Sequence, residues 1–163
     1  MLINFSLLPP SSRIWIFQSS RILLPAEVTT LQAQTDLFLQ QWTAHKADLN
    51  ASSLVVDDLF LIVAVDESEV NASGCSIDKL YQFVKNVQQQ LNIDLLDRLK
   101  VAFVNSENTI STASLKEMES MIQSGRVDGE LPVYDLTVTT LGEFSSRFKA
   151  PLKSTWLNRF QTV

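Results

Sequence analysis

The stretch Leu59-Phe60-Leu61-Ile62-Val63-Ala64-Val65 is the longest uninterrupted apolar run in this 163-residue chain. Such a run is typical of a strand buried on both faces, and it is far shorter than the roughly 20 residues that a membrane helix requires. Ser53–Val56 before it also favours a strand, and Asp57-Asp58 between them favours a tight turn over a metal site. We therefore predict a hairpin whose second arm is the central strand of a sheet.

On each side of this hairpin, the sequence predicts one further helix and one further strand. Arg13–Gln18 is β-branched and aromatic, which indicates a buried strand. Pro25 suits the first turn of a helix, and apolar residues at helical spacing continue to near His45-Lys46. A second helix follows a polar loop, and Lys100–Val104 is the next strand, which we expect to pair with Thr109–Ser111.

The resulting order is β-α-β-β-α-β, so we predict an α+β fold with a ferredoxin-like core, in which a mostly antiparallel sheet carries its helices on one face. The rest of the chain favours helix, because Ser114 and Glu117 form a capping box and Gly125 suits the position after a helix end. We expect one domain over 1–163, with a core at about 11–112 and a helical extension at about 113–163.

The amino-acid composition argues against several classes of binding partner. The net charge is −5, and because phosphate neutralisation needs a basic surface, we expect no nucleic acid as partner. No polybasic patch or long apolar segment favours a membrane, so we expect no membrane insertion. One cysteine forms no intramolecular disulfide and no multi-cysteine zinc site, and we see no signal peptide, so we expect a cytoplasmic protein without a metal.

Nucleotide-binding loops are also absent from the sequence. A backbone that wraps phosphates closely needs several glycines together, whereas this chain has four in all, and only Gly74 precedes Gly125. We therefore expect no ATPase activity and no cofactor.

The most unusual position is Gly74-Cys75, where the only cysteine follows the only glycine of the first 124 residues. Gly74 lies between a strand and a helix, where a positive φ or a close backbone approach would favour glycine. Cys75 then falls near the helix N-terminus, capped by Ser73 or Ser76, where unpaired N–H groups stabilise a thiolate or another anion.

In the expected topology, several polar residues meet at the same edge of the sheet. We predict Cys75 as nucleophile, with His45 as its base and Asp66 as the residue that orients the base. The candidate ligand- or anion-binding residues around them are Arg13, Ser73, Gly74, Ser76 and Asp78.

A plainer interpretation stands beside each of these predictions. A lone cysteine is often a small buried hydrophobe, and His45 would then complement the dipole at a helix C-terminus. Gly74 and Asp66 would be turn residues, Asp78 a favourable first-turn charge, and Arg13 a member of a surface ion pair. The three tryptophans would belong to the core.

Four segments resemble a family of small, uncharacterised bacterial proteins of about this length that often carry the label "ABC transporter ATPase". They are Arg13–Gln18, Gln41–His45, Ile62–Glu67 and Ala72–Asp78. The Ser-Gly-Cys-Ser-Ile-Asp block at Ser73–Asp78 is the most specific of them. The chain departs from this family at Lys46, where we expect a glycine after the histidine. The resemblance implies no catalytic residues.

Two functions follow from these observations. The first is a ligand- or partner-binding or regulatory module, whose partner is a small molecule, another protein or a second copy in a homodimer. The alternative is a thiol-dependent enzyme or redox sensor that uses Cys75 with His45.

Overall fold

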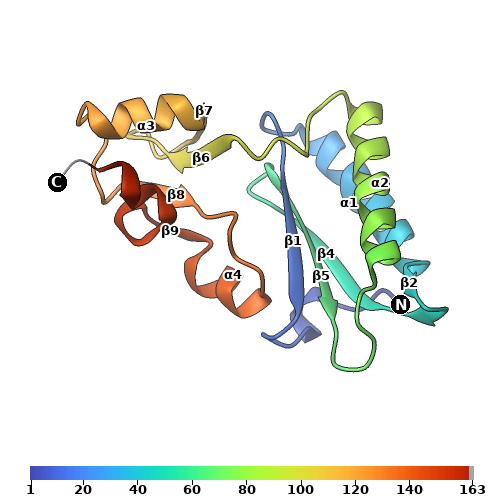
Figure 1. Cartoon of the computed structure of the whole chain (residues 1–163). Coiled ribbons are helices and arrows are strands. Elements are labelled where there is room, and N and C mark those ends of the chain that lie inside the picture. Colours follow the sequence, from blue (N-terminus) through green and yellow to red (C-terminus); the bar gives the residue numbers. More distant parts are fainter. Residues whose placement is uncertain (162–163) are drawn as a thin grey trace. The chain divides into compact units, whose positions relative to one another are not determined.

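This computed structural model describes residues 1–161, and its contacts divide the chain into two compact units (Figure 1). The N-terminal unit comprises Met1–Asp97 with Thr139–Glu143, and the C-terminal unit comprises Arg98–Val138 with the residues from Phe144 onward. The fold is α+β with mostly antiparallel sheets, as predicted. Among residues 1–161, no helix combines the length and the apolar character needed to span a bilayer. The expected single domain stays a prediction.

The N-terminal unit is built on a three-stranded antiparallel sheet in the order β1-β5-β4. Its strands are β1 (Arg13–Gln18), β4 (Asn50–Val56) and β5 (Phe60–Asp66), and β5 lies in the centre, as the apolar run predicts. The predicted hairpin is confirmed. Asp57 and Asp58 at its turn have φ of 52° and 50°, in the left-handed region that aspartate tolerates, and the Leu59 N–H donates to the Val56 carbonyl at 3.1 Å.

Two helices, α1 (Pro25–Gln40) and α2 (Gly74–Leu91), cover the same face of this sheet (Figure 1). Pro25 opens α1 as predicted, with Glu27 in the first turn. Alternate residues of the strands pack against both helices, which gives one continuous core. Its large members include Trp15, Phe17, Leu31, Leu39, Trp42, Leu61 and Leu80.

Helix α1 ends at Gln40, so the prediction that it continues to near His45-Lys46 is wrong. A short hairpin of β2 (Thr43–Ala44) and β3 (Ala47–Asp48) follows it. Trp42 continues the apolar spacing of α1 although it lies beyond the helix. It is buried against α2, where its indole N–H donates to the Ser76 carbonyl at 2.8 Å.

Both edges of the N-terminal sheet are closed. At the β4 edge, the Ile3 N–H donates to the Ala51 carbonyl and the Ala51 N–H donates to the Met1 carbonyl. Further along β4, Gln32 of α1 replaces a neighbouring strand. Its Oε1 accepts from the Val55 N–H (3.2 Å), and its Nε2 donates to the Ser53 Oγ (2.8 Å).

The β1 edge is closed by Thr139–Leu141, where the Ile14 N–H donates to the Thr139 carbonyl and the Leu141 N–H donates to the Ser12 carbonyl. The ferredoxin-like topology puts its last strand beside β1, and the strand that we expected there, β6 (Lys100–Val104), belongs to a different sheet. The six-element topology is therefore not confirmed, although the order β1-α1-β4-β5-α2 agrees with it.

The C-terminal unit holds a four-stranded sheet in the order β7-β6-β8-β9. Besides β6, its strands are β7 (Ile110–Ser114), β8 (Pro132–Tyr134) and β9 (Lys149–Pro151). The expected pairing of the strand at Lys100–Val104 with the segment after it is confirmed. The expected helical extension is only partly helical, because β8 and β9 lie within it.

Helix α3 (Leu115–Gln123) covers the core of the C-terminal sheet with Met118 and Ile122. The predicted capping box of Ser114 and Glu117 is present, and Gly125 has a φ of 72° just after the helix. The remaining elements are short. They are η1 (Phe5–Leu7), α4 (Leu141–Arg147), η2 (Leu152–Ser154) and η3 (Trp156–Phe160).

The Gln32 contacts predict a measurable contribution to stability. Gln32→Ala should lower the free energy of unfolding by about 1–2 kcal/mol, because the Val55 N–H loses its acceptor in a partly buried place. Gln82→Ala is the matched control, since Gln82 bonds only with exposed Asn86 one turn away, and it should change stability by less than about 0.5 kcal/mol. Urea unfolding measures the stability of both variants. An equal loss of stability in the two would contradict the role of Gln32 as a hydrogen-bond partner at the edge of β4.

The start of α1 predicts a pH dependence. Hydrogen bonds from Arg21 (2.7 Å to each carboxylate oxygen) and from the Leu24 N–H lower the pKa of Glu27 from its ordinary value of 4.5 to about 2. A depressed pKa means that this stabilisation is complete above pH 4.5 and is lost as the pH falls from 4.5 to about 2. Glu27→Gln should therefore destabilise the protein at pH 6 more than at pH 2, as urea unfolding at the two pH values would show. An equal loss at both would refute it.

Candidate functional site

The N-terminus of α2 is held by the two serines of the Ser73–Asp78 block. Ser73 is the N-cap, and its Oγ accepts from the Ser76 N–H at 3.2 Å. The Ser76 Oγ donates to the Ser73 carbonyl at 2.8 Å, and Ser76 is 1% exposed. Because the Ser76 carbonyl also accepts from the Trp42 indole, these serines position α2 against the hairpin after α1.

Gly74 and Cys75, between those serines, are both exposed. The plainer interpretation of Cys75 as a buried hydrophobe is therefore wrong. Gly74 has no positive φ, and a Cβ at its position would meet no atom within 4 Å, so neither expected reason for a glycine applies. Within residues 1–161, the N–H groups of Gly74 and Cys75 have no hydrogen-bond acceptor. Asp78 lies beyond the first turn, contrary to expectation.

The other acidic candidate organises a loop. The Asp66 carboxylate accepts from the Ser68 N–H at 3.0 Å, which agrees with its interpretation as a turn residue. Arg13 lies 3.8 Å from Glu67, whose carboxylate also accepts from the Ala72 N–H. Sequence reasoning missed Glu67 because nothing in the pattern distinguishes it from its neighbours.

His45 lies at the exposed tip of the β2–β3 hairpin rather than at a helix C-terminus. Its φ of 50° and the φ of 67° at Lys46 are both in the left-handed region, and glycine adopts that region without strain. In the described part of the chain, His45 makes no hydrogen bond with Cys75 or Asp66. The structure thus brings Ser73, Gly74, Cys75 and Ser76 together and does not join them to His45.

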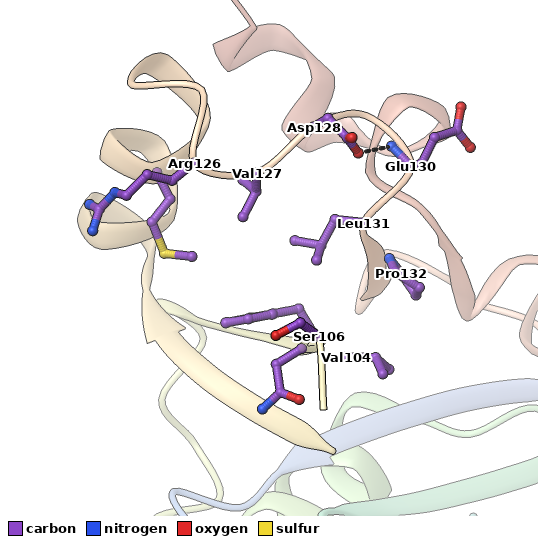
Figure 2. Close-up of a pocket in the computed structure, with 11 residues that line it drawn as sticks. Val104, Ser106, Arg126, Val127, Asp128, Glu130, Leu131 and Pro132 are labelled. Atoms are coloured by element: carbon purple, nitrogen blue, oxygen red, sulfur yellow. Dashed lines mark hydrogen bonds between the residues drawn. The ribbon is translucent and has the colours of Figure 1, made fainter. Parts of the chain in front are cut away.

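An open hollow of about 500 Å³ lies in the C-terminal unit between the end of β6, α3 and the start of β8 (Figure 2). Phe103 and Val104 form part of its lining and are almost fully buried. Three side chains are only half-buried, namely Met121, Val127 and Leu131. Figure 2 shows the Val127 and Leu131 side chains directed into the hollow.

The hollow exists because β6 and β8 separate. Their pairing is confined to Phe103 and Val133, and in this register the next pair would be Val104 with Pro132. Pro132 has no N–H, so it cannot donate to Val104. The chain before Pro132 turns away instead, with the Leu131 N–H on the Asp128 carbonyl at 3.2 Å.

Two glycines fix the wall of the hollow. Gly125 takes the positive φ after α3, and Gly129 lies so close to η2 that a Cβ would come within 2.9 Å of the Lys153 Cβ. Two of the four glycines thus lie within five residues, and this spacing was a signal in the sequence that our prediction of the site did not use.

The rim of the hollow carries charges of both signs. Asp128 accepts from the Glu130 N–H at 2.9 Å, and Glu130 forms an ion pair with Lys153. The Arg126 Nε donates to the Ser124 Oγ at 3.3 Å, and its side chain extends away from the hollow (Figure 2). Asn105 and Ser106 also line the hollow, so its interior is mostly rather than wholly apolar. With a rim close to neutral, this arrangement favours an apolar group over an ion.

No family model matches the chain, and no match was found among the curated proteins or the solved structures. The resemblance through the Ser73–Asp78 block stays a prediction. Within residues 1–161, no group of three or more His, Cys, Asp or Glu side chains is arranged to hold a metal ion.

The placement of Cys75 predicts a simple labelling result. Iodoacetamide should label the folded protein completely, because the thiol is exposed. His45→Asn should change the labelling rate at pH 7 by less than about twofold, since His45 does not contact the thiol and asparagine tolerates a positive φ. Mass spectrometry over time measures both. A tenfold slower reaction of iodoacetamide with the His45→Asn variant would support the predicted pair of Cys75 and His45. A thiol that reacts only after the protein unfolds would contradict the exposure of Cys75.

Proposed function

We propose that this protein is a cytoplasmic binding module that holds an apolar group of a ligand or protein partner in the hollow between β6, α3 and β8. The observation that supports it is the set of half-buried side chains, Met121, Val127 and Leu131, around one concave opening. Covering each of them would stabilise a complex by about 1 kcal/mol. Such a module needs no nucleotide, and we expect no ATP hydrolysis.

The rest of the hollow suits binding better than catalysis. Its lining contains no histidine or cysteine, and the carboxylate of Asp128 accepts a backbone hydrogen bond within its own turn. Catalysis needs a group that changes its protonation state or forms a bond at the reacting atom. Apolar walls and a neutral rim supply affinity and orientation instead.

The three methionines provide a direct test. Met121 lines the hollow, Met118 is fully buried in the core beneath α3, and Met1 begins the chain. In protein labelled with ¹³C at the methionine methyls, N-acetyl-leucinamide should shift the Met121 signal saturably, with a Kd of the order of 1–10 mM. N-acetyl-serinamide should not shift it. The Met118 signal reports whether the fold is intact.

Val127→Asp should abolish the Met121 shift because it introduces a charge into the apolar interior. Leu7→Asp is the control, since Leu7 is 75% exposed in the N-terminal unit and should leave binding unchanged. Equal responses to the leucine and serine compounds, or no shift of Met121 at 50 mM, would count against this function.

The alternative function is a thiol-dependent enzyme or redox sensor. Cys75 supports it through its exposure and through the two N–H groups without acceptors at the start of α2. The absence of a hydrogen bond from His45 weakens it, because a nucleophilic thiol needs a base or a charge that holds the thiolate.

A homodimer remains a prediction about partners. In the N-terminal sheet both edges are closed, by Gln32 and Met1–Ile3 on one side and by Thr139–Leu141 on the other. Pairing of two copies along these edges would first break those contacts, so edge pairing there is disfavoured.

A further inference from the structure

A second, smaller depression lies within the C-terminal unit, at the opposite end of β6 from the hollow. Its volume is about 150 Å³, and it is bounded by the start of β6, the segment after β8 and η3. Its lining includes Val101 and Leu157, both almost fully buried, and the aromatic residues Tyr134 and Trp156. This size suits one small ring rather than a large ligand.

The charged groups of this depression are cations. Arg98 and Lys100 both line it, Lys100 as the first residue of β6 and Arg98 from the segment just before that strand. No Asp or Glu lines it. Glu117 of α3 lies near Lys100, and its carboxylate accepts from the Ser114 N–H at 2.7 Å as part of the capping box.

Trp156 adds an exposed aromatic surface and brings a third cation. It is 36% exposed, contrary to the expectation that all three tryptophans belong to the core, whereas Trp15 and Trp42 are buried. The Arg159 guanidinium lies over the Trp156 ring, 5.0 Å from its centroid. In the described residues the Trp156 indole N–H has no acceptor, so it can donate to a ligand.

The net negative charge of the whole chain is unevenly divided between the two units. The C-terminal unit carries eight Lys and Arg against six Asp and Glu, a net +2, whereas the N-terminal unit carries five against twelve, a net −7. The two together give the −5 of the chain. A net negative protein can therefore present a locally positive depression to an anion.

We propose that this depression binds a small aromatic carboxylate, with the ring against Val101, Leu157 and Trp156 and the carboxylate toward Arg98 and Lys100. The arginine fork matches the two oxygens of a planar carboxylate, and the lysine adds a point charge. The ring fills a space whose walls are apolar and aromatic. Benzoate is the simplest probe that has both parts.

The indole N–H signals of ¹⁵N-labelled protein test this site. Benzoate should shift the Trp156 signal saturably, with a Kd in the millimolar range that weakens as NaCl increases. The Trp42 signal should not move, because its N–H is bonded to Ser76 in the other unit. Benzamidine, the cationic analogue, and benzyl alcohol, the neutral one, should bind at least fivefold more weakly.

Lys100→Gln and Arg98→Gln should each weaken benzoate at least fivefold, with an unshifted Trp42 signal as proof of folding. Lys116→Gln is the matched control, because Lys116 is exposed in the same unit and does not line the depression. Equal binding of benzoate and benzyl alcohol, unchanged binding in both glutamine variants, or no shift at 50 mM benzoate would each overturn the assignment.

Discussion

Every backbone amide and carbonyl of β5 must find its partner inside the protein, because the strand is buried from Phe60 to Val65. Pairing with β1 on one side and β4 on the other meets this requirement and makes those two strands the edges of the sheet. The edges then need partners of their own. The N-terminal unit supplies them by three different means, namely Met1–Ile3, the amide of Gln32 and the segment Thr139–Leu141.

The distance along the sequence between a strand and its hydrogen-bond partners explains how much of the fold the sequence could predict. The hairpin around Asp57-Asp58 and the start of α1 at Pro25 depend on neighbouring residues, and both were predicted. The outer neighbour of β1 comes from residues more than a hundred positions away. Thr139–Leu141 meets the start of β1 through two hydrogen bonds, and so short a contact leaves no strand pattern in the sequence. An apolar strand such as Lys100–Val104 fits either sheet equally well, so its own pattern could not decide between them.

The candidate site shows the same division between local and distant causes. Ser73 and Ser76 lie where helix capping predicts, and their hydrogen bonds account for half of the Ser-Gly-Cys-Ser block without any function. His45 was placed wrongly because Trp42 continues the apolar spacing of α1 while its burial comes from α2. The left-handed φ of Lys46 gives a physical reason for a glycine at that position, since glycine would adopt it without strain.

A residue type that is rare in the sequence is not always one whose substitution the fold would resist. Cys75 is the only cysteine, yet its exposed side chain and the open space around Gly74 mean that the fold does not depend on either residue. Gly129 attracted no attention in the sequence, yet a side chain there would collide with Lys153 and displace the wall of the hollow. Gly129 lies in the wall of the hollow at the end of β6, where Met121, Val127 and Leu131 are left partly uncovered. Surface that a fold leaves open although its surroundings are tightly fixed is the arrangement that a preformed binding site requires, because a rigid wall loses little entropy when a ligand arrives.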